Sequence, residues 1–256
     1  MSDAPKEIFV LVSPKNRTVY NFRGDLIREI INQDYQVYVT GPNQTDVDKI
    51  EALGVTFIEI PMNKNGIGIG EDIRYTWRLY CLFKQIKPSV ILGYTIKPVI
   101  YGSIAAQMAK VSRIFSMITG AGYLFANQSF KAKILRRIAF LLYKIGLGGS
   151  TRVIFQNSDD LEEFVAQKLV TRNKCFVVNG SGVNMQKFQP ADYPSVITFF
   201  MLSRMIYGKG VIQFFQAAER VKNIYPEARF VILGNIEIMN DAIQPEELNY
   251  YVSKNI

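Results

Sequence analysis

Short runs of apolar residues alternate along this chain with longer stretches in which apolar positions recur every three or four residues. The short runs have the length of buried strands, and the longer stretches have the periodicity of helices that cover a core. Strands that alternate with helices are typical of β-α units, in which parallel strands form one sheet and helices lie on its faces. The pattern therefore predicts an α/β fold.

Before residue 180 the pattern predicts about seven strands, enough for a complete Rossmann-like parallel sheet. The strands are expected at residues 8–12, 36–40, 55–60, 90–92, 113–117, 152–156 and 174–178. Helices are expected at residues 22–31, 46–53, 72–86, 101–109, 131–145 and 158–168. We expect residues 1–190 to form one complete domain.

After residue 190 the same pattern starts again. The residues at 192–194, Asp-Tyr-Pro, are typical of a linker. Strands are then expected at 197–202 and 229–233, and helices at 210–221 and 245–252. A domain usually has about 100 to 150 residues, so residues 191–256 are expected to be the first part of an incomplete second Rossmann-like domain.

Composition narrows the chemistry, because the chain of 256 residues contains no histidine. This excludes Ser-His-Asp and Cys-His catalysis, histidine-ligated metal sites and imidazole as a general base. Cys81 and Cys175 form no CxxC pair, which excludes a dithiol redox centre and favours a reduced compartment. Lysine, arginine, carboxylates, hydroxyls or backbone amides must carry any reaction.

The charge balance favours anionic partners. The chain has 30 Lys and Arg against 22 Asp and Glu, a net charge of +8 and a pI near 9.3, which suits nucleotide phosphates, nucleic acid or an acidic membrane surface. Asp3 and Glu7 are acidic where the start of a secretion signal would be basic. The most apolar long stretch, at 134–147, is interrupted by arginines and a lysine, which disfavours a membrane span. We expect a cytoplasmic protein with no secretion signal and no membrane span.

A cationic loop follows the first strand of the second domain. Residues 199–210 read FFMLSRMIYGKG, and the loop contains Ser203, Arg204, Gly208 and Lys209 just before a helix. The carboxyl end of a strand and the N-terminus of a helix together favour a bound diphosphate. The alternative is a solvated turn with two ordinary cations.

Polar and glycine-rich loops also follow several strands of the first domain, so that they meet at one edge of the sheet. The residues expected there are Asn21, Arg23, Tyr94, Lys97, Thr119 and Gly120. Gly180 and Gly182 follow the last strand, where they either admit an anion to backbone amides or make a hinge. For these two glycines the hinge is the stronger interpretation.

The helix predicted from residue 131 is both basic and apolar. Its cations are Lys131, Lys133, Arg136, Arg137 and Lys144. Such a helix can dock on an anionic membrane, or it can be a core helix with a cationic solvent face. The wide apolar side favours membrane contact.

Five motifs in this order resemble family 4 glycosyltransferases of the GT-B fold. They are GYTIKPVIYG (93–102), ITGAGYLF (118–125), VIFQNSDD (153–160), NGSGVN (179–184) and LSRMIYGKG (202–210). Within that family the chain is similar to bacterial enzymes that extend undecaprenyl-diphosphate-linked sugars during capsule, O-antigen or N-glycan precursor assembly. The resemblance implies a GT-B fold with the acceptor in the first domain and the nucleotide sugar mainly in the second.

The resemblance implies a retaining transfer of a hexose or N-acetylhexosamine from a UDP-sugar to an undecaprenyl-diphosphate-linked saccharide. Arg204 and Lys209 match the family's catalytic pair, which neutralises the leaving diphosphate, so that no metal and no cofactor is implied. The implied donor-binding residues are Ser203, Gly208, Gly182, Asn184 and Gly234. The implied acceptor-binding residues are Asn21, Arg23, Tyr94, Lys97, Thr119 and Gly120.

The chain also departs from the family pattern. Thr119 and Gly120 stand where wider relatives often have a histidine, and Asn184 stands where many have aspartate. Residues 245–256 resemble the stretch before the family's Glu-x7-Glu segment, so we expect a C-terminally truncated transferase with weak or no activity.

Two other functions compete with a transferase. A non-catalytic, membrane-associated subunit or remnant would keep acceptor or partner binding in residues 1–190. Nucleic-acid binding is disfavoured because no recognition motif accompanies the positive charge. We expect the protein to be peripheral on the inner face of the plasma membrane, where a nucleotide sugar and a lipid-linked saccharide can meet.

Overall fold

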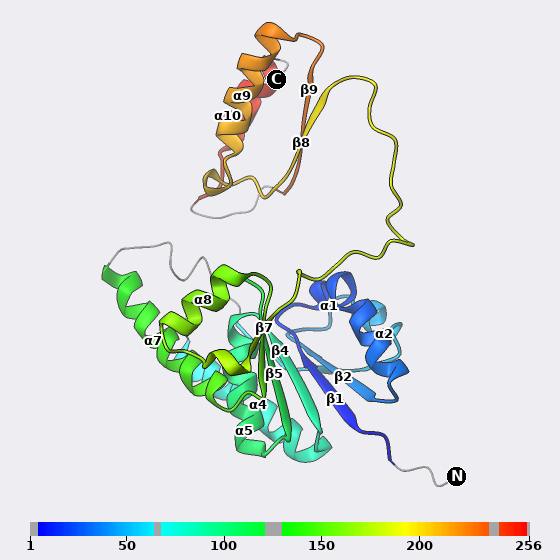
Figure 1. The fold of residues 1–256 in the computed structure, drawn as a ribbon, viewed down its shortest axis with the longest axis vertical. Coiled ribbons are helices and arrows are strands. Elements are labelled where there is room, and N and C mark those ends of the chain that lie inside the picture. The colour runs from blue at the N-terminus through cyan, green and yellow to red at the C-terminus, as the bar shows by residue number, and fades with distance from the viewer. Residues whose placement is uncertain (1–4, 64–67, 121–129, 236–240, 255–256) are drawn as a thin grey trace. The chain divides into compact units, whose positions relative to one another are not determined.

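A computed structural model describes the chain over residues 5–63, 68–120, 130–235 and 241–254. It divides into two compact units, residues 1–185 and 186–256, which are described one at a time (Figure 1). The boundary expected after residue 190 lies five residues beyond this division.

The first unit is built on a seven-stranded sheet in the order β3-β2-β1-β4-β5-β6-β7, with every neighbouring pair parallel. The strands are β1 (Ile8–Val12), β2 (Gln36–Gly41), β3 (Thr56–Glu59), β4 (Val90–Tyr94), β5 (Arg113–Ile118), β6 (Arg152–Phe155) and β7 (Cys175–Val177). The α/β fold and the Rossmann-like parallel sheet are therefore confirmed. The strand order reverses between β1 and β4, and open α/β sheets bind ligands outside the carboxyl ends of the strands at such a point.

Alternate residues of the central strand face two different cores. Phe9 and Leu11 pack with residues of the first three helices, whereas Val10 and Val12 pack with α4 and α5. The helices are α1 (Asn16–Phe22), α2 (Gly24–Asn32), α3 (Val47–Glu51), α4 (Ile69–Ile86), α5 (Ser103–Ala109), α7 (Phe130–Gly148) and α8 (Ser158–Ala166). Figure 1 shows α1 and α2 on one side of the sheet and α4, α5 and α7 on the other. Both faces of the sheet are thus covered, as a sheet of apolar parallel strands requires.

Two helices differ from the sequence prediction. The helix expected at 22–31 is α2, and the segment before it, expected to be a loop, forms a further helix, α1, which meets α2 at Arg23, where φ is −125°. The backbone N–H of Arg23 bonds the carbonyl of Val19 and ends α1, and the side chain of Arg23 turns into the protein. The helix expected at 101–109 is preceded by a π-helical turn, η1 (Pro98–Gly102), because Pro98 suits a first helical turn.

The second unit has two parallel strands, β8 (Thr198–Leu202) and β9 (Arg229–Leu233). Helices α9 (Val211–Ile224) and α10 (Pro245–Ser253) accompany them, and η3 (Tyr207–Lys209) precedes α9. Its core includes Phe215 and Tyr251, whose rings stack with their centroids 4.6 Å apart. At the strand ends, a Cβ on Gly234 would lie 1.7 Å from the Ser203 carbonyl oxygen, so only glycine permits this approach.

Candidate functional site

Loops from the switch point of the first unit converge on the hydroxyl of Tyr94, the last residue of β4. The Ser13 Oγ lies 2.7 Å from the Tyr94 hydroxyl oxygen, and the Thr18 Oγ1 lies 2.8 Å from it. The Arg23 guanidinium carbon lies 4.9 Å from the centre of the Tyr94 ring. These residues meet because β1 and β4 are neighbours, so the segments that follow both strands leave the sheet at the same edge.

Arg23 is a buried cation without a carboxylate partner in the described part of the chain. Its side chain is 5% exposed. Its Nη1 donates to the Ser181 Oγ at 2.7 Å and to the Phe22 carbonyl oxygen at 3.0 Å, whereas its Nε has no hydrogen-bond acceptor. Burial lowers the pKa of the Arg23 guanidinium and raises the pKa of the Tyr94 hydroxyl. A buried charge paired only with neutral groups is costly, and an anion from a ligand would lower that cost.

The segment after β7 reaches the same place. Ser181 accepts the hydrogen bond from Arg23, and the Asn184 Nδ2 donates to both carboxylate oxygens of Asp25, at 3.2 and 3.1 Å. Gly180 and Gly182 have φ of +77° and +70°, a conformation that favours glycine. The structure therefore brings Gly182 and Asn184, predicted to bind the donor, close to Arg23, predicted to bind the acceptor.

Lys97 forms a buried ion pair that the sequence analysis missed. Its Nζ lies 2.6 Å from the Asp72 Oδ1, and the two side chains are 13% and 5% exposed. The Tyr101 hydroxyl donates to the Asp72 Oδ2 at 3.0 Å. Burial, with a smaller effect of Asp72, raises the pKa of Tyr101. Asp72 balances the charge of Lys97, so Lys97 in this arrangement positions α4 against the segment after β4.

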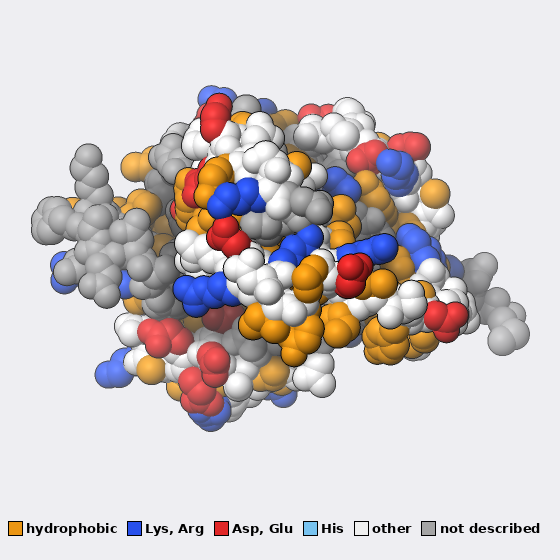
Figure 2. All heavy atoms as spheres, turned by 90° about the horizontal axis from the view of Figure 1, so that it is seen from above, with side chains coloured by type: hydrophobic (Ala, Val, Ile, Leu, Met, Phe, Trp, Pro, Cys, Tyr) orange, Lys and Arg blue, Asp and Glu red, His pale blue; other side chains and the backbone are white. Residues whose placement is uncertain are grey.

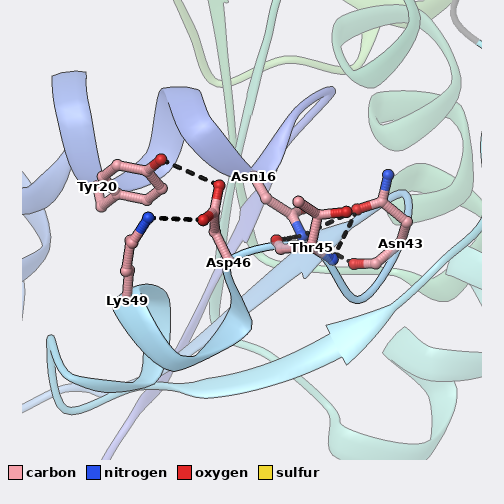
Figure 3. Close-up of polar contacts among 6 residues, drawn as sticks. All are labelled: Asn16, Tyr20, Asn43, Thr45, Asp46 and Lys49. Carbon is pink, nitrogen blue, oxygen red and sulfur yellow. Dashed lines mark hydrogen bonds and ion pairs between the residues drawn. The ribbon is translucent and has the colours of Figure 1, made fainter.

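A second polar cluster, also missed from the sequence, fastens the loop after β2 (Figure 3). The Asn16 Nδ2 donates to the carbonyl oxygens of Asn43 and Thr45, at 2.8 and 2.7 Å. The Asp46 carboxylate accepts from the Tyr20 hydroxyl at 3.1 Å and pairs with the Lys49 Nζ at 2.7 Å. The hydrogen bond from Lys49, with a smaller one from Tyr20, lowers the pKa of Asp46. The cluster ties the segments after β1 and β2 together.

The remaining predicted acceptor residues lie nearer to solvent. Asn21 is exposed on α1, and Thr119 and Gly120 follow β5. Gly120 has a φ of +133°, which favours glycine. Residues 121–125 of the ITGAGYLF motif lie outside the described residues.

In the second unit, one loop holds most of the predicted donor-binding residues. Ser203, Arg204, Gly208 and Lys209 lie between β8 and α9, and Gly234 lies against Ser203. Arg204 and Lys209 are exposed. The Gly208 N–H donates to the Asp241 Oδ2 at 3.1 Å, so a carboxylate already bonds one of the amides predicted to meet a phosphate. Asp241 had no signal in the sequence, because its role depends on a contact with a distant loop.

Helix α7 combines both predicted properties. Tyr143 and Leu147 are buried, whereas Arg137 and Lys144 are exposed and Arg136 is half-buried. The side chains of Lys131 and Lys133 lie outside the described residues. The helix also exposes a row of apolar side chains, namely Ile134, Leu135, Ile138, Leu141 and Ile145. Among the described helices, none is long and apolar enough to cross a membrane.

The positive charge does not form one continuous field on the face that Figure 2 shows. Blue Lys and Arg side chains alternate there with red Asp and Glu and with orange hydrophobic side chains. Over the described ranges, no three or more His, Cys, Asp or Glu residues are grouped so that they could hold a metal ion.

Comparison with known proteins places the chain in a family. Residues 10–157 match the glycosyl transferase 4-like family, and the chain belongs to it. That match covers the switch point, the Tyr94 cluster and the Lys97–Asp72 pair. The motif at 93–102 lies within the matched residues, and the motif at 153–160 begins within them and extends past residue 157. The resemblance drawn from these motifs is therefore confirmed.

Two curated relatives are transferases that act on undecaprenol-linked sugars. The chain is 24% identical over 239 residues to the N,N'-diacetylbacillosaminyl-diphospho-undecaprenol alpha-1,3-N-acetylgalactosaminyltransferase of Campylobacter jejuni, which covers 87% of this chain and 62% of that enzyme. It is 28% identical over 211 residues to the UDP-Gal:alpha-D-GlcNAc-diphosphoundecaprenol alpha-1,3-galactosyltransferase of Escherichia coli, which covers 77% of this chain and 52% of that enzyme. The chain thus spans only part of the length of these relatives.

Solved structures support the fold. A glycosyltransferase from Rickettsia africae superposes with a TM-score of 0.67 at 17% identity, covering 98% of this chain and 65% of that one. A UDP-N-acetylglucosamine 2-epimerase from Listeria monocytogenes gives a TM-score of 0.61 at 11% identity, covering 98% and 66%. Similarity at this level of identity shows the shared fold, and it agrees with the GT-B prediction.

Proposed function

We propose that this chain carries the acceptor-binding domain and the diphosphate-binding loop of a retaining glycosyltransferase. The donor would be a UDP-sugar, with a hexose or an N-acetylhexosamine, and the acceptor an undecaprenyl-diphosphate-linked saccharide. The observation that carries the proposal is the similarity to two transferases whose names both include diphospho-undecaprenol and an alpha-1,3 linkage. One of these names also gives UDP-Gal as donor.

The acceptor side of the proposal rests on Arg23. Its guanidinium is buried beside Tyr94, has a spare N–H and lacks a carboxylate among the described residues. A guanidinium in such surroundings binds phosphate oxygens strongly, since the local dielectric constant is low and its donors match their geometry. We therefore assign Arg23 to the acceptor's diphosphate and the neighbouring loop residues to the sugar.

The donor side rests on Arg204 and Lys209, which share the loop before α9. During the transfer the bond between the sugar C1 and the diphosphate oxygen breaks, and the acceptor hydroxyl oxygen bonds C1 on the same face. The departing phosphate oxygen takes the acceptor's proton, so a chain without histidine can perform the step. The two cations stabilise the negative charge that develops on the leaving diphosphate.

The membrane side rests on α7. Its exposed apolar row lies next to Arg137 and Lys144 on the helix surface. Apolar residues that enter the headgroup region and cations that attract anionic lipids together favour peripheral binding, at about 1 kcal/mol per cation near the surface. The expected partner is the inner face of the plasma membrane, where the lipid-linked saccharide would be presented.

The test is a UDP-release assay with UDP-GalNAc or UDP-Gal and GlcNAc-diphosphoundecaprenol in anionic vesicles. We expect Arg204→Ala and Lys209→Ala each to lower the rate about 100- to 1,000-fold, and we expect the product to be α-linked by NMR. Arg220→Ala, which removes an exposed cation from α9, is the matched control and should not change the rate. Undiminished turnover in the two loop variants would contradict their role.

Binding without turnover is the second possible result of that assay. If the chain binds the lipid-linked saccharide but releases UDP from neither donor, the acceptor-binding subunit or remnant is the correct function. Arg23→Met should then abolish saccharide binding. Arg204→Ala and Lys209→Ala should bind the saccharide as the wild type does, because only the first unit would contribute.

A further inference from the structure

Helices α4, α5 and α7 lie on one side of the sheet of the first unit (Figure 1). An apolar groove runs between them. Its volume of about 430 Å³ is within the range typical of small-molecule sites. Its walls include Ile69, Ile73 and Trp77 of α4, Met108 of α5, and Ile138 and Leu142 of α7. The first five of these side chains are between 44% and 73% exposed. Water-exposed apolar side chains gathered in a groove indicate a binding surface.

The groove ends at polar groups that are already paired. Asp72 lines it, but its carboxylate bonds Lys97 and Tyr101. Thr76 also lines it, and its hydroxyl donates to the Asp72 carbonyl oxygen at 2.7 Å. Asp72, Thr76 and Tyr101 therefore have hydrogen bonds within the protein, and the surface left for a ligand is mostly hydrocarbon.

The polar end of the groove is connected along the chain to the candidate acceptor site. Lys97, which holds Asp72, lies three residues after Tyr94, against which Arg23 packs. A ligand with its anionic head at Arg23 could therefore continue past the Lys97–Asp72 pair into the groove. Arg137, which directly precedes the groove residue Ile138 on α7, is exposed, and its charge suits a ligand that joins a diphosphate to a hydrocarbon chain.

We propose that the groove binds the first isoprene units of a polyprenyl diphosphate, the lipid part of the acceptor. The inference deepens the proposed function and rests on it for the identity of the lipid. A linear chain fits a groove between helices, whereas a membrane leaflet would require the exposed apolar residues to lie on one flat face. Chain binding here would fix the diphosphate at Arg23 and direct the saccharide across the edge of the sheet.

Trp77 makes the proposal directly measurable, because it is the only tryptophan of the chain and it lines the groove. The full chain is titrated, below the micelle concentration, with geranyl diphosphate, farnesyl diphosphate and inorganic pyrophosphate. We expect a blue shift of the Trp77 emission with both lipids and none with pyrophosphate. Affinity should rise about tenfold or more from geranyl to farnesyl, because an open groove removes the added carbons only partly from water.

Substitutions separate the groove from the apolar face of α7. Ile73→Gln and Ile138→Gln, at exposed positions of the groove wall, should each weaken farnesyl diphosphate binding about tenfold. Leu141→Gln is the matched control, because Leu141 is 60% exposed on α7 and does not line the groove; it should bind as the wild type does. The unfolding midpoint of each variant checks that the fold is retained.

Three results would overturn the proposal. One is an affinity that does not depend on chain length, and another is an equal loss in Leu141→Gln, which would assign binding to a flat apolar face. The third is a Trp77 shift that follows protein concentration without lipid, which would assign the groove to a second copy. If the chain releases no UDP but still binds the lipids with an affinity that depends on chain length, only the transferase function is contradicted. The failure of the proposed function can therefore be distinguished from the failure of the groove proposal.

Discussion

The two units of the chain use parallel strands in different ways. The first unit covers its sheet on both faces, so that β1 sends alternate residues into two cores. In the second unit Met201 and Ile232 pack on the core below α9, while their strand neighbours Leu202 and Val231 remain 73% and 44% exposed. A sheet covered on one face holds its loops less firmly, because fewer buried contacts must break before they move.

This difference extends to the candidate site. Arg23 and Lys97 of the first unit are largely buried and held by defined partners, whereas Lys209 and Arg204 of the second unit are exposed on their loop. Charges fixed in a low-dielectric environment act strongly on a ligand and need little reorganisation. The first unit therefore holds its two cations in buried, fixed positions, whereas the two loop cations of the second unit are exposed to solvent.

The largest effect expected in this comparison comes from the buried ion pair. Lys97→Met leaves the Asp72 carboxylate buried without its counter-ion, so the free energy of unfolding of the first unit should fall by about 3–5 kcal/mol. Urea unfolding followed by Trp77 fluorescence measures it. Lys49→Met breaks an ion pair whose lysine is 54% exposed and should cost far less. Equal losses would show that burial of the Lys97–Asp72 pair has no energetic consequence.

The second effect tests the smaller unit. Gly234→Ala places a Cβ where the Ser203 carbonyl oxygen stands, and the resulting overpacking should destabilise the second unit by about 1–3 kcal/mol. Limited proteolysis, with fragments assigned by mass, should show faster cleavage after residue 185 and an unchanged first unit. Gly70→Ala, where a Cβ meets nothing within 4 Å, is the control. Protection of the second unit in Gly234→Ala would contradict the close approach.

Much of this fold follows directly from the sequence. β1 and β9 have the predicted bounds, Ile8–Val12 and Arg229–Leu233, because a short apolar run between polar segments has few alternatives in an α/β chain. The break between α1 and α2 could not be predicted in this way. It depends on the Arg23 side chain packing on Tyr94, a contact between segments far apart in the sequence.

The site could be predicted only in part. Loop residues at the carboxyl ends of strands, such as Tyr94 and Lys97, are visible in the sequence because the topology gathers them. The partners of these residues cannot be recognised in the sequence. Lys97 looks like a free cation there, but its ion pair with Asp72 makes it a positioning residue. The groove was missed for a related reason. Ile69, Ile73 and Trp77 repeat at helical spacing, which predicts an apolar helix face. The spacing does not show whether this face is buried in the core or exposed to solvent.

A smaller effect concerns the Tyr94 hydroxyl. Tyr94→Phe keeps the ring against Arg23 but removes the hydrogen bonds with Ser13 and Thr18, which should cost about 0.5–1.5 kcal/mol. Urea unfolding measures the loss. Tyr20→Phe, which removes a hydroxyl bonded to the Asp46 carboxylate at the surface, is the control. A larger loss in Tyr20→Phe would contradict the central place of Tyr94 in the preorganised edge.

The smallest effect is a pH dependence at the opposite end of the same strands. Hydrogen bonds from Ser89 and Arg113 lower the pKa of Glu7 from its ordinary value of 4.5. A lowered folded-state pKa means that the ionised group stabilises the fold above pH 4.5, and that this contribution is lost as the pH falls through the folded value.

Glu7→Gln should therefore lower the melting temperature slightly at pH 6 to 7, and the difference from wild type should shrink as the pH falls below about 4.5. Thermal unfolding between pH 7 and pH 3 measures it. Arg113→Gln breaks the same pair from the other side and should reproduce most of this profile. The effect is small because the Arg113 and Glu7 side chains are 40% and 55% exposed, and water screens their attraction. A difference that grows on acidification would have the wrong sign, and would mean that protonated Glu7 is the form the fold prefers.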